Sequence, residues 1–290
     1  MKRCLVCNAH HISKNTECPT CGFSPALVDG FCAYAPELAH AANGFNPLHF
    51  HDLYRLEEAN FWFQSRNQLI LWALGKYCPS FQSLLEVGCG TGFVLSGIAK
   101  QFPHVKLFGS ELFTAGLHFA ISRLPSVKFM QMDASNIPFR EEFDVIGAFD
   151  VLEHIENDER VLTEMQAALN TQGYMLLTVP QHTWLWSPID EYACHVRRYS
   201  ISSLIKKIEN AGFQIVRSTS FITTLLPLMM ISRFVQKNLL DGKFDATREL
   251  QVAPWLNAFL RQALQFELLC IKKGFSFPAG GSRLIVAMKI

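Results

Sequence analysis

The fold is decided by one stretch of the chain, Ser83-Leu84-Leu85-Glu86-Val87-Gly88-Cys89-Gly90-Thr91-Gly92-Phe93. A short apolar run stops at three closely spaced glycines, and residues 93–101 then follow a helical pattern. Glycine tolerates left-handed backbone and lets a ligand press against bare main chain. The stretch therefore predicts a strand, a ligand-binding turn built on Gly88, Gly90 and Gly92, and a helix.

Strands and helices alternate outward from this turn. Helical patterns begin near Phe61, at 114–124, after Asn157 and after Ser200, and the last two residues can cap their helices. We expect the helix after Asn157 to end at Gly173. Strands are expected at 83–87, 106–110, 127–131, 143–149, 174–179, 213–219 and 283–289. Such alternation is typical of an α/β fold with a doubly wound, mainly parallel sheet that helices cover on both faces.

Composition narrows the class of protein. The chain has 290 residues, 49% hydrophobic and 18% charged, which suits a large core and excludes a disordered chain. Lys plus Arg number 26 against 25 Asp plus Glu, and this balance argues against a protein that coats nucleic acid. No apolar leader follows Met1, and the longest apolar run, 221–231, falls short of the roughly 20 residues that span a membrane. We therefore expect a cytoplasmic protein with reduced cysteines.

Four of the nine cysteines form two closely spaced pairs, Cys4 with Cys7 and Cys18 with Cys21. A C-x2-C spacing lets both thiolates of a pair reach one tetrahedral zinc ion. The ten mostly polar residues between the pairs cannot build a core of their own. The pattern predicts a structural zinc ribbon at 1–30, which we expect to be followed by a linker at 31–60 and the main domain at 61–290.

The interval 221–281 interrupts the alternation before the last strand. It contains two apolar helical patterns, 222–239 and 254–273, and is rich in Phe and Met, which suit irregular apolar contacts. We expect a helical cap inserted into the domain. Its role stays open between a wall of an apolar pocket, a patch that docks on a membrane or a second subunit, and a structural brace.

Two classes of ligand compete for the glycine turn. Dinucleotide sites use G-x-G-x-x-G with a pyrophosphate on the helix N-terminus, but here Phe93 stands where the third glycine would be. Glu86 also places an anion beside the turn, which repels a pyrophosphate and suits a cationic amino-acid group. The residues therefore favour a cationic ligand.

This combination resembles the first motif of class I S-adenosylmethionine-dependent methyltransferases, and three further motifs follow at strand ends, with Glu111, Asp133-Ala134 and Asp150. The resemblance implies a Rossmann-like sheet of seven strands and S-adenosylmethionine as cofactor. It also implies that Glu111 accepts hydrogen bonds from the ribose and that Asp133 faces the adenine amine. Arg66, on the helix before the first strand, is expected to pair with the cofactor carboxylate. The implied cofactor contacts are Arg66, Glu86, Gly88, Gly90, Gly92, Glu111, Asp133, Ala134 and Asp150.

The segment after the fourth strand, Asp150-Val151-Leu152-Glu153-His154, is similar to that of small-molecule O-methyltransferases, including ubiquinone-type enzymes. His154 is a candidate base for a hydroxyl acceptor. Two alternatives stay open: a histidine that only supports the cofactor loop, and a divalent ion held by Asp150, Glu153 and His154, ligands proposed for the ubiquinone-type enzymes.

A loop after the fifth strand resembles the W-x3-D-x4-H-x-R-R-Y segment of a bacterial methyltransferase subfamily often found with glycan, lipid or natural-product genes. We expect Asp190 and His195 to act in catalysis. The remaining members are expected to contact the acceptor: His182, Trp184, Trp186, Arg197, Arg198 and Tyr199. The alternative is a buried network of Asp190, His195 and Arg197 that only fixes the loop.

The sequence therefore favours methylation of a small-molecule, lipid or glycan acceptor, expected at oxygen. One alternative is an RNA methyltransferase that uses the ribbon to bind RNA, but Lys2, Arg3 and Lys14 stand against Glu17 and Asp29, so the ribbon is hardly basic. A non-enzymatic adaptor is the third reading, and the intact cofactor motifs argue against it.

Overall fold

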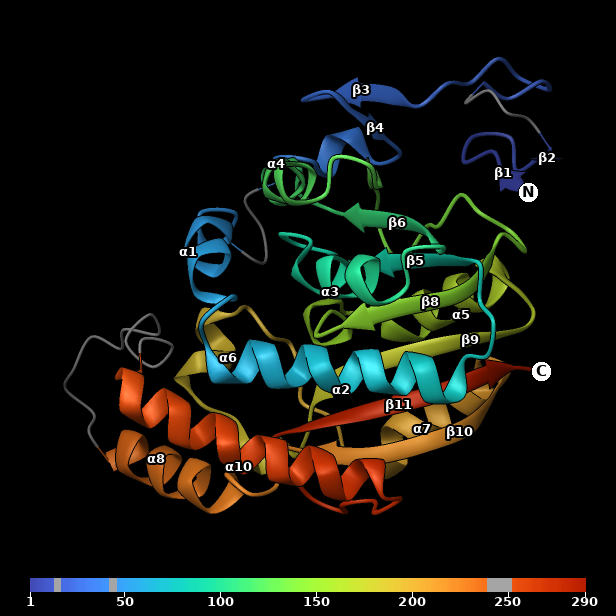
Figure 1. Ribbon diagram of the computed structural model, residues 1–290. Coiled ribbons are helices and arrows are strands. Elements are labelled where there is room, and N and C mark those ends of the chain that lie inside the picture. The colour runs from blue at the N-terminus through green and yellow to red at the C-terminus, as the bar shows by residue number, and fades with distance from the viewer. Residues whose placement is uncertain (13–16, 42–45, 239–251) are drawn as a thin grey trace.

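The computed structural model describes residues 1–12, 17–41, 46–238 and 252–290, and a mixed sheet forms its centre (Figure 1). The strand order is β10-β11-β9-β8-β5-β6-β7-β4-β3. The seven strands expected from the sequence are all present: β5 (Ser83–Val87), β6 (Lys106–Glu111), β7 (Lys128–Gln131), β8 (Phe143–Phe149), β9 (Leu169–Pro180), β10 (Phe213–Phe221) and β11 (Ser282–Lys289).

The five neighbouring strands β9, β8, β5, β6 and β7 are parallel to one another. β11 lies between β9 and β10 and is antiparallel to both. The sequence prediction was wrong about Gly173, which lies inside β9 and not at a helix end. A Cβ there would lie 2.9 Å from the Asn170 oxygen and 3.1 Å from the Asp144 oxygen. The glycine therefore serves a close backbone approach next to the register shift between β8 and β9.

Helices cover both faces of the sheet and create two apolar cores (Figure 1). One face carries α2 (Phe61–Tyr77), α3 (Phe93–Gln101) and α4 (Thr114–Arg123). The other face carries α5 (Asp158–Ala168) and α7 (Ile201–Asn210). The predicted caps are confirmed, because Asn157 accepts from the Arg160 amide and Ser200 from the Ser203 amide.

Part of the N-terminal segment belongs to the central sheet. After the hairpin of β1 (Lys2–Arg3) and β2 (His10–His11), a second hairpin of β3 (Ala26–Val28) and β4 (Phe31–Ala33) extends the sheet. β4 pairs in parallel with β7, so the sheet has nine strands in the described residues, not seven.

β4 lies within the expected linker at 31–60, and the hairpin of β3 and β4 spans the expected ribbon boundary at residue 30. Alternating burial of Phe31, Ala33 and Ala35 explains the pairing. The turn η1 (Pro36–Leu38) and the helix α1 (His49–Leu56) follow, and residues 42–45 lie outside the described part.

The insertion contains α8 (Leu226–Asn238) and α10 (Pro254–Lys272), close to the expected helices, while residues 239–251 lie outside the described part. α10 packs along α2 through a buried stripe of Leu260, Leu264, Leu268 and Ile271. In the described residues, no helix combines the length and the hydropathy needed to cross a membrane.

Candidate active site

The glycine turn lies where β5 meets α3, and its backbone explains its residues. Gly88, Gly90 and Gly92 all have positive φ, at 68°, 50° and 74°. A Cβ on Gly88 would lie 2.5 Å from Val151 Cγ2, and one on Gly92 would lie 3.2 Å from the Ala120 backbone. Side chains at Gly88 and Gly92 would meet both strain and close contacts, and at Gly90 the positive φ alone disfavours a side chain.

The predicted carboxylates at the ends of β6 and β7 lie at the same edge of the sheet as the turn. Glu111 is buried, and its carboxylate accepts from the amides of Gly90, Leu112 and Phe113. Burial still raises the pKa of Glu111 above its usual value, against these hydrogen bonds. Asp133 accepts from both the amide and the hydroxyl of Ser135, so it closes a local turn beside Ala134.

Buried carboxyl groups gather between β5 and β8. Burial raises the pKa of Glu86 well above its ordinary range, although Arg66 nearby acts to lower it. Its Oε2 atom has no hydrogen-bond partner among the described residues, and neither has either carboxylate oxygen of Glu153. Arg66 pairs with Asp150, a residue with positive φ just after β8, and stacks on Trp62 at 4.5 Å. One buried arginine therefore faces several carboxylates, which suits a cationic ligand.

The segment before α2 covers the turn, a feature that the sequence prediction missed. Phe50 of α1 is buried over the loop, and a Cβ on Gly116 would lie 3.1 Å from its ring. Glu57 accepts from the Thr91 hydroxyl at 2.6 Å and from Arg123 at 3.1 Å. Only a fold that brings α1, the glycine turn and α4 together creates this contact, so no local spacing could reveal it.

Two histidines meet at the end of β8. His154 ends the turn η2 (Leu152–His154), and its ring lies 4.8 Å from that of His195 in an edge-to-face arrangement. Burial, and after it His195, lowers the pKa of His154 to about 4. Ligand atoms of Glu153, His154 and His195 lie within 4.8 Å of one another, whereas Asp150 is turned to Arg66.

Asp190 organises the loop that carries His195. It is fully buried at the start of α6 (Pro188–Tyr192), where it and Ser187 form a capping box. Its Oδ1 lies 2.8 Å from His195 Nδ1 and 2.8 Å from Arg198 Nε. Burial acts to raise the pKa of Asp190, but the hydrogen bond from His195 and the charge of Arg198 outweigh it and lower the pKa. Asp190 therefore fixes the orientation of the His195 ring.

The other residues of the loop divide into anchors and exposed groups. Arg197 is 3.1 Å from Asp158 and donates to the Ile155 and Glu156 oxygens, so the network around Asp190 contains Arg198 in place of the expected Arg197. Tyr199 is buried and donates to Asp158.

His182, by contrast, stacks on Trp184 next to the turn η3 (Thr183–Leu185). Trp184 is 56% exposed and Trp186 is 39% exposed, so these two rings are available to another molecule.

Comparison with known proteins decides the family. A family model described as a methyltransferase domain matches residues 55–218, more than half of the chain. The chain belongs to the class I S-adenosylmethionine-dependent methyltransferases. The methyltransferase is 26% identical over 203 residues to a probable S-adenosylmethionine-dependent methyltransferase of Mycobacterium tuberculosis, covering 63% of this chain and 71% of the relative.

Two further comparisons cover different shares of the chain. The methyltransferase is 32% identical over 102 residues to phthiotriol/phenolphthiotriol dimycocerosates methyltransferase 1 of Mycobacterium ulcerans, covering 34% of this chain and 38% of that one. A structure of phosphoethanolamine N-methyltransferase 2 of Haemonchus contortus with S-adenosyl-L-methionine superposes with a TM-score of 0.56. At 18% identity, over 84% of this chain and 57% of that one, this likeness shows the fold.

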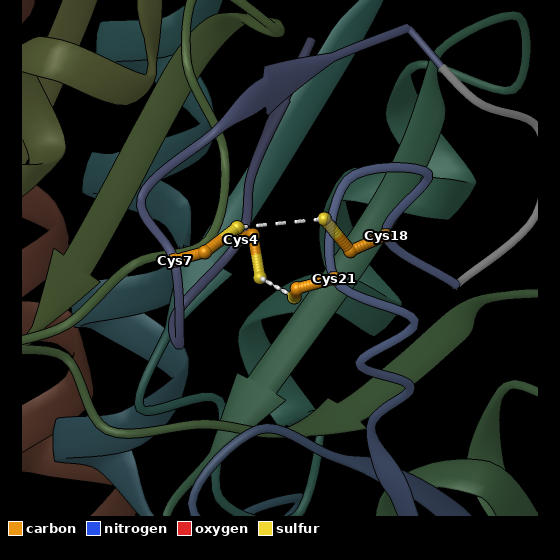
Figure 2. A group of neighbouring side chains, drawn as sticks. All are labelled: Cys4, Cys7, Cys18 and Cys21. Carbon is orange, nitrogen blue, oxygen red and sulfur yellow. Dashed lines mark hydrogen bonds between the residues drawn. The ribbon is translucent and has the colours of Figure 1, made fainter.

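The four N-terminal cysteines of the methyltransferase converge on one point (Figure 2). Cys4 Sγ lies 3.6 Å from Cys21 Sγ, and Cys7 Sγ lies 3.7 Å from Cys18 Sγ. A zinc ion bound at about 2.3 Å by four sulfurs sets neighbouring sulfurs about 3.8 Å apart, so the geometry fits zinc. The two pairs lie in turns of the same kind. The Asn8 amide donates to the Cys4 oxygen and the Gly22 amide donates to the Cys18 oxygen, and both donors have positive φ.

The cysteine hairpins are bound to the catalytic domain. The Arg3 amide donates to the Pro138 oxygen, and the Arg140 amide donates to the Met1 oxygen. Glu164 of α5, 3% exposed, pairs with Arg3, Arg140 and Arg160. The cysteine cluster therefore lies next to the segment between β7 and β8 and next to α5.

Proposed function

We propose that the enzyme methylates a hydroxyl group of an apolar, lipid-like or glycan-type acceptor. The observation that carries this proposal is the Asp190–His195 pair beside the end of β8. A carboxylate on Nδ1 leaves Nε2 of a neutral imidazole free to accept a proton. A hydroxyl acceptor needs such a base, because its proton leaves as the methyl group arrives.

We assign the proton acceptor to His195, with Asp190 as the positioning residue. Burial and the neighbouring imidazole make His154 a weak base, since its pKa is about 4. His154 remains neutral near pH 7 and does not compete electrostatically with a proton on His195. His154 was expected from the sequence to be the base. We now propose that its ring only limits the space around the His195 ring.

The cofactor supplies an electrophilic methyl group, and the residues of the chain bind and orient it. We assign its cationic amino-acid end to Glu86, whose buried Oε2 has no partner among the described residues. Glu111 and Asp133 are assigned to the ribose and the adenine, with Ala134 beside them. Arg66, held by Asp150, is assigned to the cofactor carboxylate.

The apolar character of the acceptor is supported by the insertion. A small pocket reaches Arg66 between α2, the end of β10 and α10, and Trp62, Phe221, Leu264 and Leu268 line it. The relative that acts by name on phthiotriol dimycocerosates is consistent with an acceptor that carries hydroxyl groups. The loop after β9 is proposed to shape the acceptor site. Its contacting residues are His182, Trp184 and Trp186, and the buried or paired residues Arg197, Arg198 and Tyr199 hold the loop in place.

Transfer of a labelled methyl group tests the proposal. The enzyme and labelled S-adenosylmethionine are incubated separately with bacterial lipid extract, a soluble metabolite fraction and RNA. We expect label in the lipid or glycan-containing fraction as a methyl ether. His195→Gln should lower kcat at least tenfold, while the affinity for S-adenosylhomocysteine stays within twofold. Label in RNA would refute the proposed class of acceptor, and label at nitrogen would refute O-methylation.

We also propose that Cys4, Cys7, Cys18 and Cys21 hold one structural zinc ion. Elemental analysis of the full chain should give one zinc per chain, and Cys21→Ser should lose it. Cys270→Ser, outside the cluster, is the matched control and should keep it. Stoichiometric zinc in the Cys21→Ser protein would contradict the assignment. A truncation at residue 31 is less informative, because it removes β3 from the sheet.

A further inference from the structure

The insertion helix α10 carries two apolar stripes on opposite sides. Its buried stripe faces α2. A second stripe consists of Trp255, Phe259, Phe266 and Leu269, which are 73%, 66%, 65% and 57% exposed. At 100° per residue these positions lie about half a turn away from Leu264 and Leu268. A helix that only covers a core needs one such stripe, so the second one has a separate use.

Neighbouring residues enlarge this outer face. Phe275, just after α10, is 62% exposed, and Leu228 and Ile231 of α8 are 53% and 63% exposed. In Figure 1, α8 is drawn next to α10 at the lower edge of the molecule. We call Trp255, Phe259, Phe266, Leu269 and Phe275 the aromatic face. Exposed apolar groups of this number mark an interaction surface.

Within the described parts of the insertion, 222–238 and 252–281, the exposed charge around the aromatic face is positive only. Residues 222–238 contain no Asp or Glu, and residues 252–281 contain one, Glu267. Glu267 is 2% exposed and accepts from the Thr224 amide and hydroxyl, so it presents no charge outward. Lys272 and Lys273, at the end of the stripe, are exposed. Within the described residues the face is therefore apolar with a basic end and no exposed carboxylate.

We propose that the aromatic face docks on a membrane surface that contains anionic lipids. Trp and Phe on one side of a helix, with Lys beside them, are the features by which helices bind in the plane of a bilayer interface. A second copy fits less well, because within the described residues the face offers no exposed carboxylate to pair with the lysines of another copy. Docking stands apart from the identity of the acceptor, but it places the pocket next to Arg66 one helix away from the lipid.

Co-sedimentation of the full chain with vesicles tests the proposal. The vesicles contain phosphatidylcholine alone or with one third phosphatidylglycerol, and no cofactor is added, so the result does not depend on methyl transfer. We expect binding to the anionic vesicles that falls at least fivefold when salt is raised from 0.05 to 0.5 M. Phe259→Gln with Phe266→Gln should weaken binding at least tenfold, and Lys272→Gln with Lys273→Gln at least threefold.

Leu27→Gln is the matched control, since Leu27 is 76% exposed at the opposite end of the sheet, and it should bind as the wild type does. All variants should bind S-adenosylhomocysteine unchanged, which confirms that they fold. Equal binding to neutral vesicles, unchanged binding by the double Phe variant, or no binding at all would overturn the proposal. So would light scattering that shows a dimer which the double Phe variant dissociates.

Discussion

Replacing Glu86 by Gln should stabilise the protein without cofactor and weaken cofactor binding. The carboxyl is fully buried, and burial raises its pKa well above the ordinary value even with Arg66 nearby. A group with a raised pKa in the folded state holds a proton that the unfolded chain loses from about pH 4.3. Its contribution to stability therefore falls as pH rises toward the raised pKa. A neutral amide of the same shape avoids that loss.

Glu86→Gln should stabilise the free protein but weaken its binding of the cofactor. A hydrogen bond between charged groups contributes about 1.5–3 kcal/mol, so Glu86→Gln should weaken binding of S-adenosylhomocysteine by about 10- to 150-fold. The cationic amino group favours the carboxylate, so binding to the wild type should release a proton below the raised pKa. Binding to Glu86→Gln should release none.

Titration calorimetry in two buffers with different ionisation heats, from pH 5 to pH 8, counts these protons. Urea unfolding of both proteins without cofactor measures the free energy of unfolding, which should be higher for Glu86→Gln. The reasoning is refuted if the wild type releases no proton at pH 5 to 6. It is also refuted if Glu86→Gln binds as tightly as the wild type.

Three further predictions concern Glu111, Asp190 and His154. Glu111→Ala should weaken cofactor binding by about 1–3 kcal/mol, because the ribose hydroxyls assigned to Glu111 would be buried without their acceptor, and calorimetry showing less than a twofold change would contradict it. Asp190→Ala should lower the free energy of unfolding by about 3–5 kcal/mol, because Arg198 stays buried and unpaired, and a change below about 1 kcal/mol in urea unfolding would count against this role. With its pKa lowered to about 4, His154 should make the protein less stable as pH falls from about 6.5 toward 4, and His154→Gln should flatten that pH dependence of urea unfolding.

The fold and the strand-end carboxylates could be predicted because their signals are local. Glu86, Glu111 and Asp150 each follow or end a short apolar run, and parallel strands bring such ends to one edge. The S-adenosylmethionine cofactor follows from that order of residues and is confirmed by the family.

Contacts that depend on tertiary placement could not be predicted. β4 has only three residues, and its burial pattern is too short to separate it from a loop. Arg197 and Arg198 are adjacent, and only the path of an irregular loop decides which one reaches Asp190. The contact of Glu57 with Arg123 joins segments 66 residues apart, and no spacing within either segment indicates it.

The pairing of β4 with β7 also has a consequence for the order in which the protein assembles. Cys32 lies opposite Met130, so this contact closes a loop of about one hundred residues, at an entropic cost of roughly 4 kcal/mol that two paired positions cannot offset. We therefore expect β4 to dock after β5, β6 and β7 have paired. Until then β7 is an edge strand with free amide groups, the condition in which folding intermediates aggregate. Pulsed hydrogen exchange during refolding should show the amides of β5 protected before those of β4.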